Sequence, residues 1–108
     1  MEQYLDARGR PRVVITGMGM VSPVGLGREA TWDSLLAGKS GAGLIQAFDT
    51  EKYSCKIAAE VLDFDPLEHL DKKEARKTDR YAQFAIAAAE EALADAGMLE
   101  EKPASETT

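Results

Sequence analysis

Arg12-Val-Val-Ile-Thr16 leads directly into Gly17-Met-Gly-Met-Val-Ser-Pro-Val-Gly-Leu-Gly27, and these two runs indicate the fold class of the chain. The first run is mostly β-branched and shows no polar alternation, a pattern typical of a strand buried on both faces between helices. The second run is too rich in glycine and proline for regular structure, so it predicts a loop across the end of that strand. We therefore expect an α/β fold.

A short helix is predicted next, over residues 28–37. Its apolar side chains, Trp32, Leu35 and Leu36, have helical spacing and are expected to form a buried stripe. Gly38 follows and is placed to end the helix in the left-handed conformation.

A longer helix is predicted near the carboxyl end, between a cap at Thr78 or Asp79 and a stop at Gly97. Five of the eight residues on its expected buried face are alanines, so we expect this helix to approach a neighbour closely. That face repeats at i, i+3, i+4 and i+7 and comprises Tyr81, Phe84, Ala85, Ala88, Ala89, Ala92, Leu93 and Ala96.

The remaining segments are predicted to be mostly irregular. Residues 39–47 are loop-like, residues 56–61 carry a weak strand pattern, and Pro66 lies near the start of a short helical turn. Two short strands are a poor basis for an independent core, so the sequence describes part of a domain. We expect residues 1–11 to be a flexible leader and residues 100–108 to be a disordered tail.

Composition and charge exclude several classes of function. The 108 residues are 44% hydrophobic and 30% charged, as in ordinary soluble domains. The net charge of −6 argues against nucleic acid as a partner, and no apolar run approaches the roughly 20 residues that cross a bilayer. The single cysteine cannot form an internal disulfide, and the first residues do not form a secretory signal. We therefore expect a cytoplasmic protein with no membrane partner.

Two glycine motifs suggest nucleotide binding, and both fail. Gly17-x-Gly19 would need a third glycine where the chain has Ser22, and no helix begins directly at the loop. Gly38-Lys-Ser40 would need a glycine where the chain has Asp33, and it follows a helix instead of a strand. A nucleotide-binding domain is therefore a weak alternative, to be rejected if no nucleotide raises the melting temperature.

No residue of the chain offers a catalytic or metal centre. Cys55 has no helix amino terminus or histidine predicted beside it, so we expect a half-buried structural cysteine. His69 is the only histidine and lacks metal-ligand spacing, so we expect it at the surface or partly packed. Two carboxylate pairs are expected on solvated faces: Asp63 with Asp65, and Glu90 with Glu91.

A basic cluster interrupts this acidic chain at residues 72–80. If the segment is helical, Lys73, Arg76, Lys77 and Arg80 stand at i, i+3, i+4 and i+7 and share one face. The spacing leaves two interpretations open, a solvated face partly neutralised by neighbouring carboxylates or a site for an acidic partner.

Several motifs, in order, resemble the β-ketoacyl-acyl carrier protein synthases, most closely the type II, chain-elongating enzymes of bacterial fatty-acid synthesis. The resemblance covers about residues 12–99. Its motifs are Arg12-Val-Val-Ile-Thr-Gly-Met-Gly-Met-Val-Ser-Pro-Val-Gly25, Trp32-Asp-Ser-Leu-Leu-Ala-Gly-Lys-Ser-Gly41, Phe48-Asp49, Asp63-Phe-Asp-Pro66, Asp71-Lys-Lys-Glu-Ala-Arg-Lys77 and Asp79-Arg-Tyr-Ala-Gln-Phe-Ala-Ile-Ala-Ala-Ala-Glu-Glu-Ala-Leu93.

The resemblance implies the incomplete amino-terminal part of a thiolase-like layered α/β/α/β/α sandwich. The family's enzymes are homodimeric acyltransferases that condense malonyl-carrier protein with an acyl group held on a cysteine, without a metal or organic cofactor. That cysteine and two histidines come later in the family's chains, so neither Cys55 nor His69 matches them. The chain by itself is therefore expected to be an inactive fragment.

The resemblance favours the second interpretation of the basic cluster. The family's carrier-protein docking patch includes basic residues in the segment that matches Lys73, Arg76 and Lys77, and acyl carrier proteins are small and acidic. We expect these three residues to dock acyl carrier protein, with Arg80 extending their face. The alternative is a stand-alone truncated module that binds acyl carrier protein or a full-length synthase.

Overall fold

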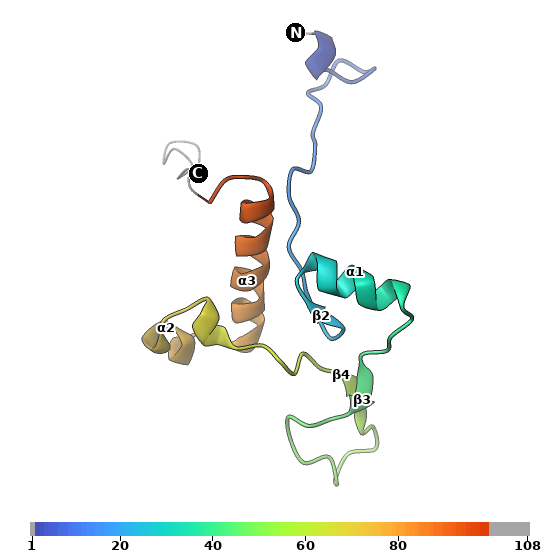
Figure 1. The fold of residues 1–108 in the computed structure, drawn as a ribbon, viewed down its shortest axis with the longest axis vertical. Helices are drawn as coiled ribbons and strands as arrows, with labels where there is room; N and C mark the ends of the chain where they lie inside the picture. The colour runs from blue at the N-terminus through green and yellow to red at the C-terminus, as the bar shows by residue number, and fades with distance from the viewer. Residues whose placement is uncertain (1, 100–108) are drawn as a thin grey trace.

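A computed structural model describes residues 2–99 and shows an elongated arrangement of short elements (Figure 1). The radius of gyration is 18.7 Å, compared with about 13 Å for a compact domain of about 100 residues. Phe64 and Ala87 are the buried hydrophobic residues of the described part, so the core is small. The tail predicted over residues 100–108 lies outside the described residues.

The first described residues form a turn of their own. η1 is a 3-10 helix over Glu2–Tyr4. The backbone N–H and the guanidinium of Arg10 hydrogen-bond to the Asp6 carboxylate, and with a further bond from the Arg8 N–H they hold the pKa of Asp6 below its ordinary value. The flexibility expected of residues 1–11 stays a prediction.

The segment predicted as a buried strand, residues 12–16, belongs to no sheet among the described residues. Val13 is 93% exposed, Val14 73% and Ile15 83%. The strand prediction is wrong here because a strand exists only through hydrogen bonds to a neighbour, and no described segment supplies one.

The glycine-rich run forms a minimal hairpin where only a loop was predicted. β1 (Val21–Ser22) pairs antiparallel with β2 (Gly25–Leu26). α1 (Arg28–Leu36) follows directly and confirms the predicted short helix. Gly38, with φ 69°, is left-handed just beyond the end of α1, as predicted.

α1 packs on this hairpin through hydroxyl groups. Thr31 and Ser34 are its buried residues; Thr31 Oγ1 lies 2.8 Å from Ser22 Oγ, and Ser34 Oγ donates to the carbonyl oxygen of Val24 at 2.7 Å. The predicted burial of the apolar stripe is wrong, because the neighbouring side of the helix faces the hairpin. The stripe residues remain more than half exposed: Trp32, Leu35 and Leu36.

A second antiparallel pair joins β3 (Ala42–Leu44) to β4 (Ile57–Ala59). β4 confirms the strand predicted over residues 56–61 with narrower bounds, whereas β3 lies in the predicted loop over residues 39–47. The chain then continues through three helical segments that confirm the turn at Pro66 and the long helix: η2 (Pro66–Glu68), α2 (Lys72–Lys77) and α3 (Arg80–Asp95).

The backbone before the hairpin passes very close to α3. A Cβ added to Gly19 would lie 1.7 Å from the carbonyl oxygen of Ala88, and one added to Gly17 would lie 2.2 Å from that of Ala92. Only glycine permits such an approach, so the glycines serve packing here. The predicted close approach of the alanine-rich helix is confirmed.

The face of α3 that packs is rotated from the predicted one. Gln83 and Ala87 are its buried residues, and Phe84 makes an edge-to-face contact with buried Phe64, with ring centroids 4.9 Å apart. Alanine is common on both sides of this helix, so the apolar periodicity located the packed face poorly. Four residues of the predicted face are exposed: Tyr81, Ala85, Ala89 and Leu93.

Candidate functional site

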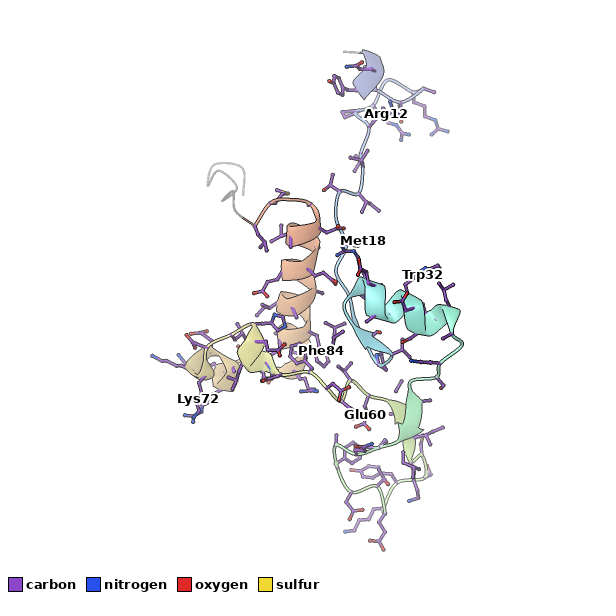
Figure 2. All side chains as sticks on the ribbon, in the orientation of Figure 1. Arg12, Met18, Trp32, Glu60, Lys72 and Phe84 are labelled. Carbon is purple, nitrogen blue, oxygen red and sulfur yellow. The ribbon has the colours of Figure 1, made fainter. Side chains whose placement is uncertain are left out.

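The basic cluster lies mainly on α2, which projects from the edge of the molecule (Figure 2). Lys73, Arg76 and Lys77 occupy helical positions i, i+3 and i+4, so they share one face, and all three are exposed. We call these three residues the α2 basic face. Within residues 2–99 none of them forms an ion pair, so three cations are presented to solvent.

Local hydrogen bonds define α2 although it has only six residues. The Asp71 carboxylate caps it by accepting the N–H of Glu74 at 2.7 Å, and the Thr78 hydroxyl donates to the Glu74 carbonyl oxygen at 2.6 Å. Arg76 and Lys77 lie in the last turn, where cations interact favourably with the helix dipole. Extended backbone at Thr78, with φ −111° and ψ 127°, ends the helix.

Arg80 does not extend the α2 basic face. The break at Thr78 places Arg80 on the separate helix α3, whose N-cap position is Asp79, one of the two predicted caps, although its side chain makes no capping hydrogen bond. The Arg80 guanidinium carbon lies 5.0 Å from the ring centroid of Phe84, and Nη2 donates to the carbonyl oxygen of Val61 at 2.7 Å. The prediction of one continuous helical face over residues 72–80 is therefore wrong.

Buried Gln83 ties the end of α2 to α3. Its Nε2 lies 3.1 Å from the carbonyl oxygen of Ala75 and 3.1 Å from that of Thr78. Both partners are acceptors, so the amide nitrogen must be the group that faces them. The sequence-based predictions gave Gln83 no role.

His69 ties the entry to α2 to the same helix. Its Nδ1 lies 2.7 Å from Glu90 Oε2, and its ring stacks on Phe64 with centroids 5.6 Å apart. The side chain is 25% exposed, which confirms the partly packed alternative predicted for it. Glu90 therefore has a structural partner that the sequence did not indicate.

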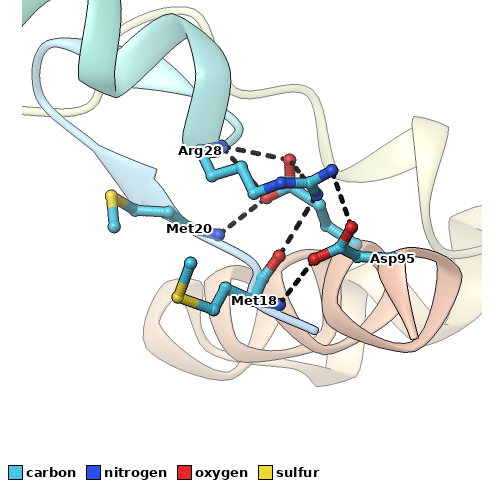
Figure 3. Close-up of polar contacts among 5 residues, drawn as sticks. Met18, Met20, Arg28 and Asp95 are labelled. Atoms are coloured by element: carbon cyan, nitrogen blue, oxygen red, sulfur yellow. Dashed lines mark hydrogen bonds and ion pairs between the residues drawn. The ribbon is translucent and has the colours of Figure 1, made fainter. Parts of the chain in front are cut away.

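A charged cluster joins the backbone of residues 18–20, α1 and α3 (Figure 3). Glu91 Oε1 accepts the N–H of Met20 at 2.8 Å, and Glu91 Oε2 accepts the N–H of Arg28 at 3.0 Å. Asp95 accepts the N–H of Met18 at 3.1 Å, and its other oxygen pairs with the Arg28 guanidinium at 3.0 Å. Glu91 is therefore a cross-link, and its predicted placement on a solvated face is wrong.

The same cluster argues against the nucleotide alternative. The Glu91 carboxylate already accepts the N–H of Arg28, the first residue of α1, where a phosphate would need to bind. A sequence signal for the cluster does exist. Ala88, Glu91, Ala92 and Asp95 stand at i, i+3, i+4 and i+7, so the acids lie on the face that approaches the glycines.

Removing the Glu91 carboxylate is expected to destabilise the chain. A Glu91→Ala variant leaves the N–H groups of Met20 and Arg28 without their acceptor, so we expect a loss of about 1–3 kcal/mol of unfolding free energy. Urea denaturation followed by circular dichroism measures the loss. The exposed Glu29→Ala variant is the matched control and should change stability by less than about 0.5 kcal/mol. Equal losses in the two variants would contradict the cross-link.

Other chemical groups of the described chain do not form a reaction centre. Cys55 is exposed, with Sγ 3.5 Å from the carbonyl oxygen of Ile57, so its predicted half-burial is wrong. Residues 2–99 contain no group of three or more histidine, cysteine or acidic side chains placed to hold a metal ion. None of the described helices has both the length and the apolar character needed to span a membrane.

Comparisons with known proteins agree with the resemblance described above. Residues 10–108 match the profile of the family described as Beta-ketoacyl synthase, N-terminal domain. The 3-oxoacyl-[acyl-carrier-protein] synthase 2 of Staphylococcus aureus (strain COL) is 51% identical over 85 residues, covering 79% of this chain and 20% of that protein. The enzyme of the same name from Coxiella burnetii is 52% identical over 87 residues, covering 81% of this chain and 21% of that protein.

A solved structure shares the arrangement of the described elements. The ishigamide ketosynthase/chain length factor superposes with a TM-score of 0.70 at 41% identity, covering 82% of this chain and 22% of that chain. The predicted fold class, an incomplete amino-terminal part of a thiolase-like α/β sandwich, is confirmed. The chain spans about a fifth of the length of the curated relatives that it matches.

Proposed function

The chain belongs to the β-ketoacyl synthase family, and on that premise we propose that it forms the amino-terminal part of a 3-oxoacyl-[acyl-carrier-protein] synthase. The whole enzyme is an acyltransferase that condenses malonyl-carrier protein with an enzyme-bound acyl group during fatty-acid elongation. It is a cytoplasmic homodimer. The contribution of residues 12–99 is a scaffold and a docking surface for acyl carrier protein.

The observation that carries the docking assignment is the α2 basic face. Lys73, Arg76 and Lys77 are exposed, lie on one helical face and have no ion-pair partner among residues 2–99. The chain as a whole carries a net charge of −6, so long-range electrostatics would repel an acidic protein from most of its surface. The three cations of the α2 basic face therefore favour binding of an acidic carrier protein at that part of the surface.

Exposed apolar side chains support the scaffold assignment. Val13, Val14 and Ile15 are exposed and pair with no strand among residues 2–99, and a hollow of about 300 Å³ is lined in part by Met20 and Trp32. Exposed apolar groups in such number are typical of surfaces that another part of an assembly covers. In the proposed enzyme, the remaining four-fifths of a typical family chain covers them.

The alternative is a stand-alone module that binds acyl carrier protein or a full-length synthase. The α2 basic face supports this binding module as well as it supports the synthase, because docking of acyl carrier protein requires no catalytic residue. Cys55 gives catalysis no support, since its side-chain hydrogen bond within residues 2–99 goes to a backbone carbonyl oxygen and not to a base that could activate the thiol. The two functions differ in whether the chain completes an active synthase.

A chimera separates the two functions. Residues 12–99 replace the matching segment of the Staphylococcus aureus synthase, and condensation of malonyl-carrier protein with an acyl group is measured. We expect an active chimera, and we expect the 108-residue chain alone to show no condensation. A chimera that is folded by circular dichroism but inactive would contradict the synthase assignment, as would condensation by the chain alone.

A further inference from the structure

We infer that Gln83 is a positioning residue for acyl carrier protein, acting through α2 without touching the partner. The inference rests on the proposed docking function, and it adds the hydrogen bonds that hold the docking surface in place. Its basis is that one buried polar side chain on the packed helix α3 binds two carbonyl oxygens at the carboxyl end of α2.

α2 has little else to hold it. A helix of six residues is far below the length at which isolated helices are stable in water, about 12–15 residues. None of its residues is buried, so hydrophobic packing contributes little to its placement. Its orientation therefore depends on the hydrogen bonds at its two ends.

Gln83 supplies the fixed point at the carboxyl end. The residue is 7% exposed, and its amide donates to Ala75 within α2 and to Thr78 just beyond it. These two bonds flank the last turn, which carries Arg76 and Lys77. A rotation of α2 about its own axis would break at least one of them, so the bonds fix the direction in which the cations point.

His69 and Glu90 supply a second fixed point at the amino end. The hydrogen bond between Nδ1 and Oε2 lies two residues before the Asp71 cap, and the stack on Phe64 holds the imidazole against the small core. Both anchoring partners, Gln83 and Glu90, belong to α3. The docking surface is thus tethered twice to one rigid helix.

The test compares affinity for Staphylococcus aureus acyl carrier protein in the chimeric synthase described above, which contains residues 12–99 of this chain, and in its variants. Gln83→Met keeps the side-chain volume and removes both donors, and we expect about a five- to tenfold weaker Kd because α2 loses its orientation. Gln46→Met is the matched control, since Gln46 is exposed and far from α2 in sequence, and its affinity should not change.

A coupling measurement separates positioning from simple loss of stability. In a chain that carries alanine at Lys73, Arg76 and Lys77, Gln83→Met should weaken binding no further, because there are no cations left to position. A merely structural role would lower affinity by the same factor in both backgrounds. Equal factors, or a folded Gln83→Met variant with the affinity of the parent chain, would overturn the inference.

The second anchor keeps the test decisive if Gln83→Met unfolds. His69→Phe retains the aromatic stack on Phe64 and removes the bond to Glu90, and we expect about a threefold weaker Kd. An unchanged Kd in that variant would count against the tethering of α2. If the triple-alanine chain binds as tightly as the parent, the docking function itself is wrong, whatever the anchor variants do.

Discussion

A Gly19→Ala variant is expected to lose about 3 kcal/mol or more of unfolding free energy, the upper end of what overpacking usually costs. The added methyl carbon would lie 1.7 Å from the carbonyl oxygen of Ala88 and 2.7 Å from the carbonyl carbon of the same residue. Both atoms belong to helix backbone, which cannot swing aside as the end of a flexible side chain can. Residues 17–20 would have to leave α3, taking the bonds of the charged cluster with them.

The loss is measured as a shift in the urea midpoint. Gly43→Ala is the control, because a Cβ there meets nothing within 4 Å and Gly43, like Gly19, has no positive φ. We expect the control to change stability by less than about 0.5 kcal/mol. Equal midpoints for the two variants would show that the backbone of residues 17–20 does not rest on α3.

A Lys73→Glu/Lys77→Glu variant is expected to bind acyl carrier protein about 10- to 100-fold more weakly at low salt, or about 1.4–2.8 kcal/mol. Each change replaces an attraction to an acidic partner with a repulsion. Binding of the parent chain should weaken as salt is added, because exposed charges are screened, whereas the variant should lose this dependence. Isothermal titration over a range of salt concentrations measures both effects.

The matched control makes the same change of charge at two lysines outside α2. Lys39→Glu/Lys52→Glu also makes the chain four charges more negative, but both lysines lie outside α2 and are exposed. If binding depends on the α2 basic face, the control should lose much less affinity. Similar losses in the two variants would mean that net charge alone governs the encounter, and the docking assignment would fail.

The helices were predictable from sequence because their ends carry local signals. Gly38 and Gly97 both adopt positive φ just beyond a helix, and Asp79 stands at the start of α3. Such signals act within a few residues, so they survive whatever surrounds the helix. Long-range structure was less predictable. Residues 12–16 have the composition of a strand but lack a partner strand among the described residues.

The charged residues of the candidate site could be predicted from the sequence, whereas the contacts that hold α2 in place could not. Lys73, Arg76 and Lys77 share the predicted helical face, whereas the helix break at Thr78 removes Arg80 from it. The break is a matter of backbone conformation at one residue, which no spacing argument reveals. The hydrogen bonds of Gln83 to the end of α2 were not predicted, because a single glutamine within an alanine-rich helix has no periodic pattern of its own.

The charged cluster also governs the order in which the chain can fold. Met18 bonds to Asp95 across 77 positions and Met20 to Glu91 across 71, so these contacts close most of the described chain into a loop. Closing so long a loop has a large entropic cost, which favours formation of local turns and helices first. During synthesis at about 5–20 residues per second, residues 17–20 wait roughly 4–15 seconds for their partners on α3 to be made. Residues 17–20 therefore reach their place against α3 only after α3 has been made, although they come earlier in the chain.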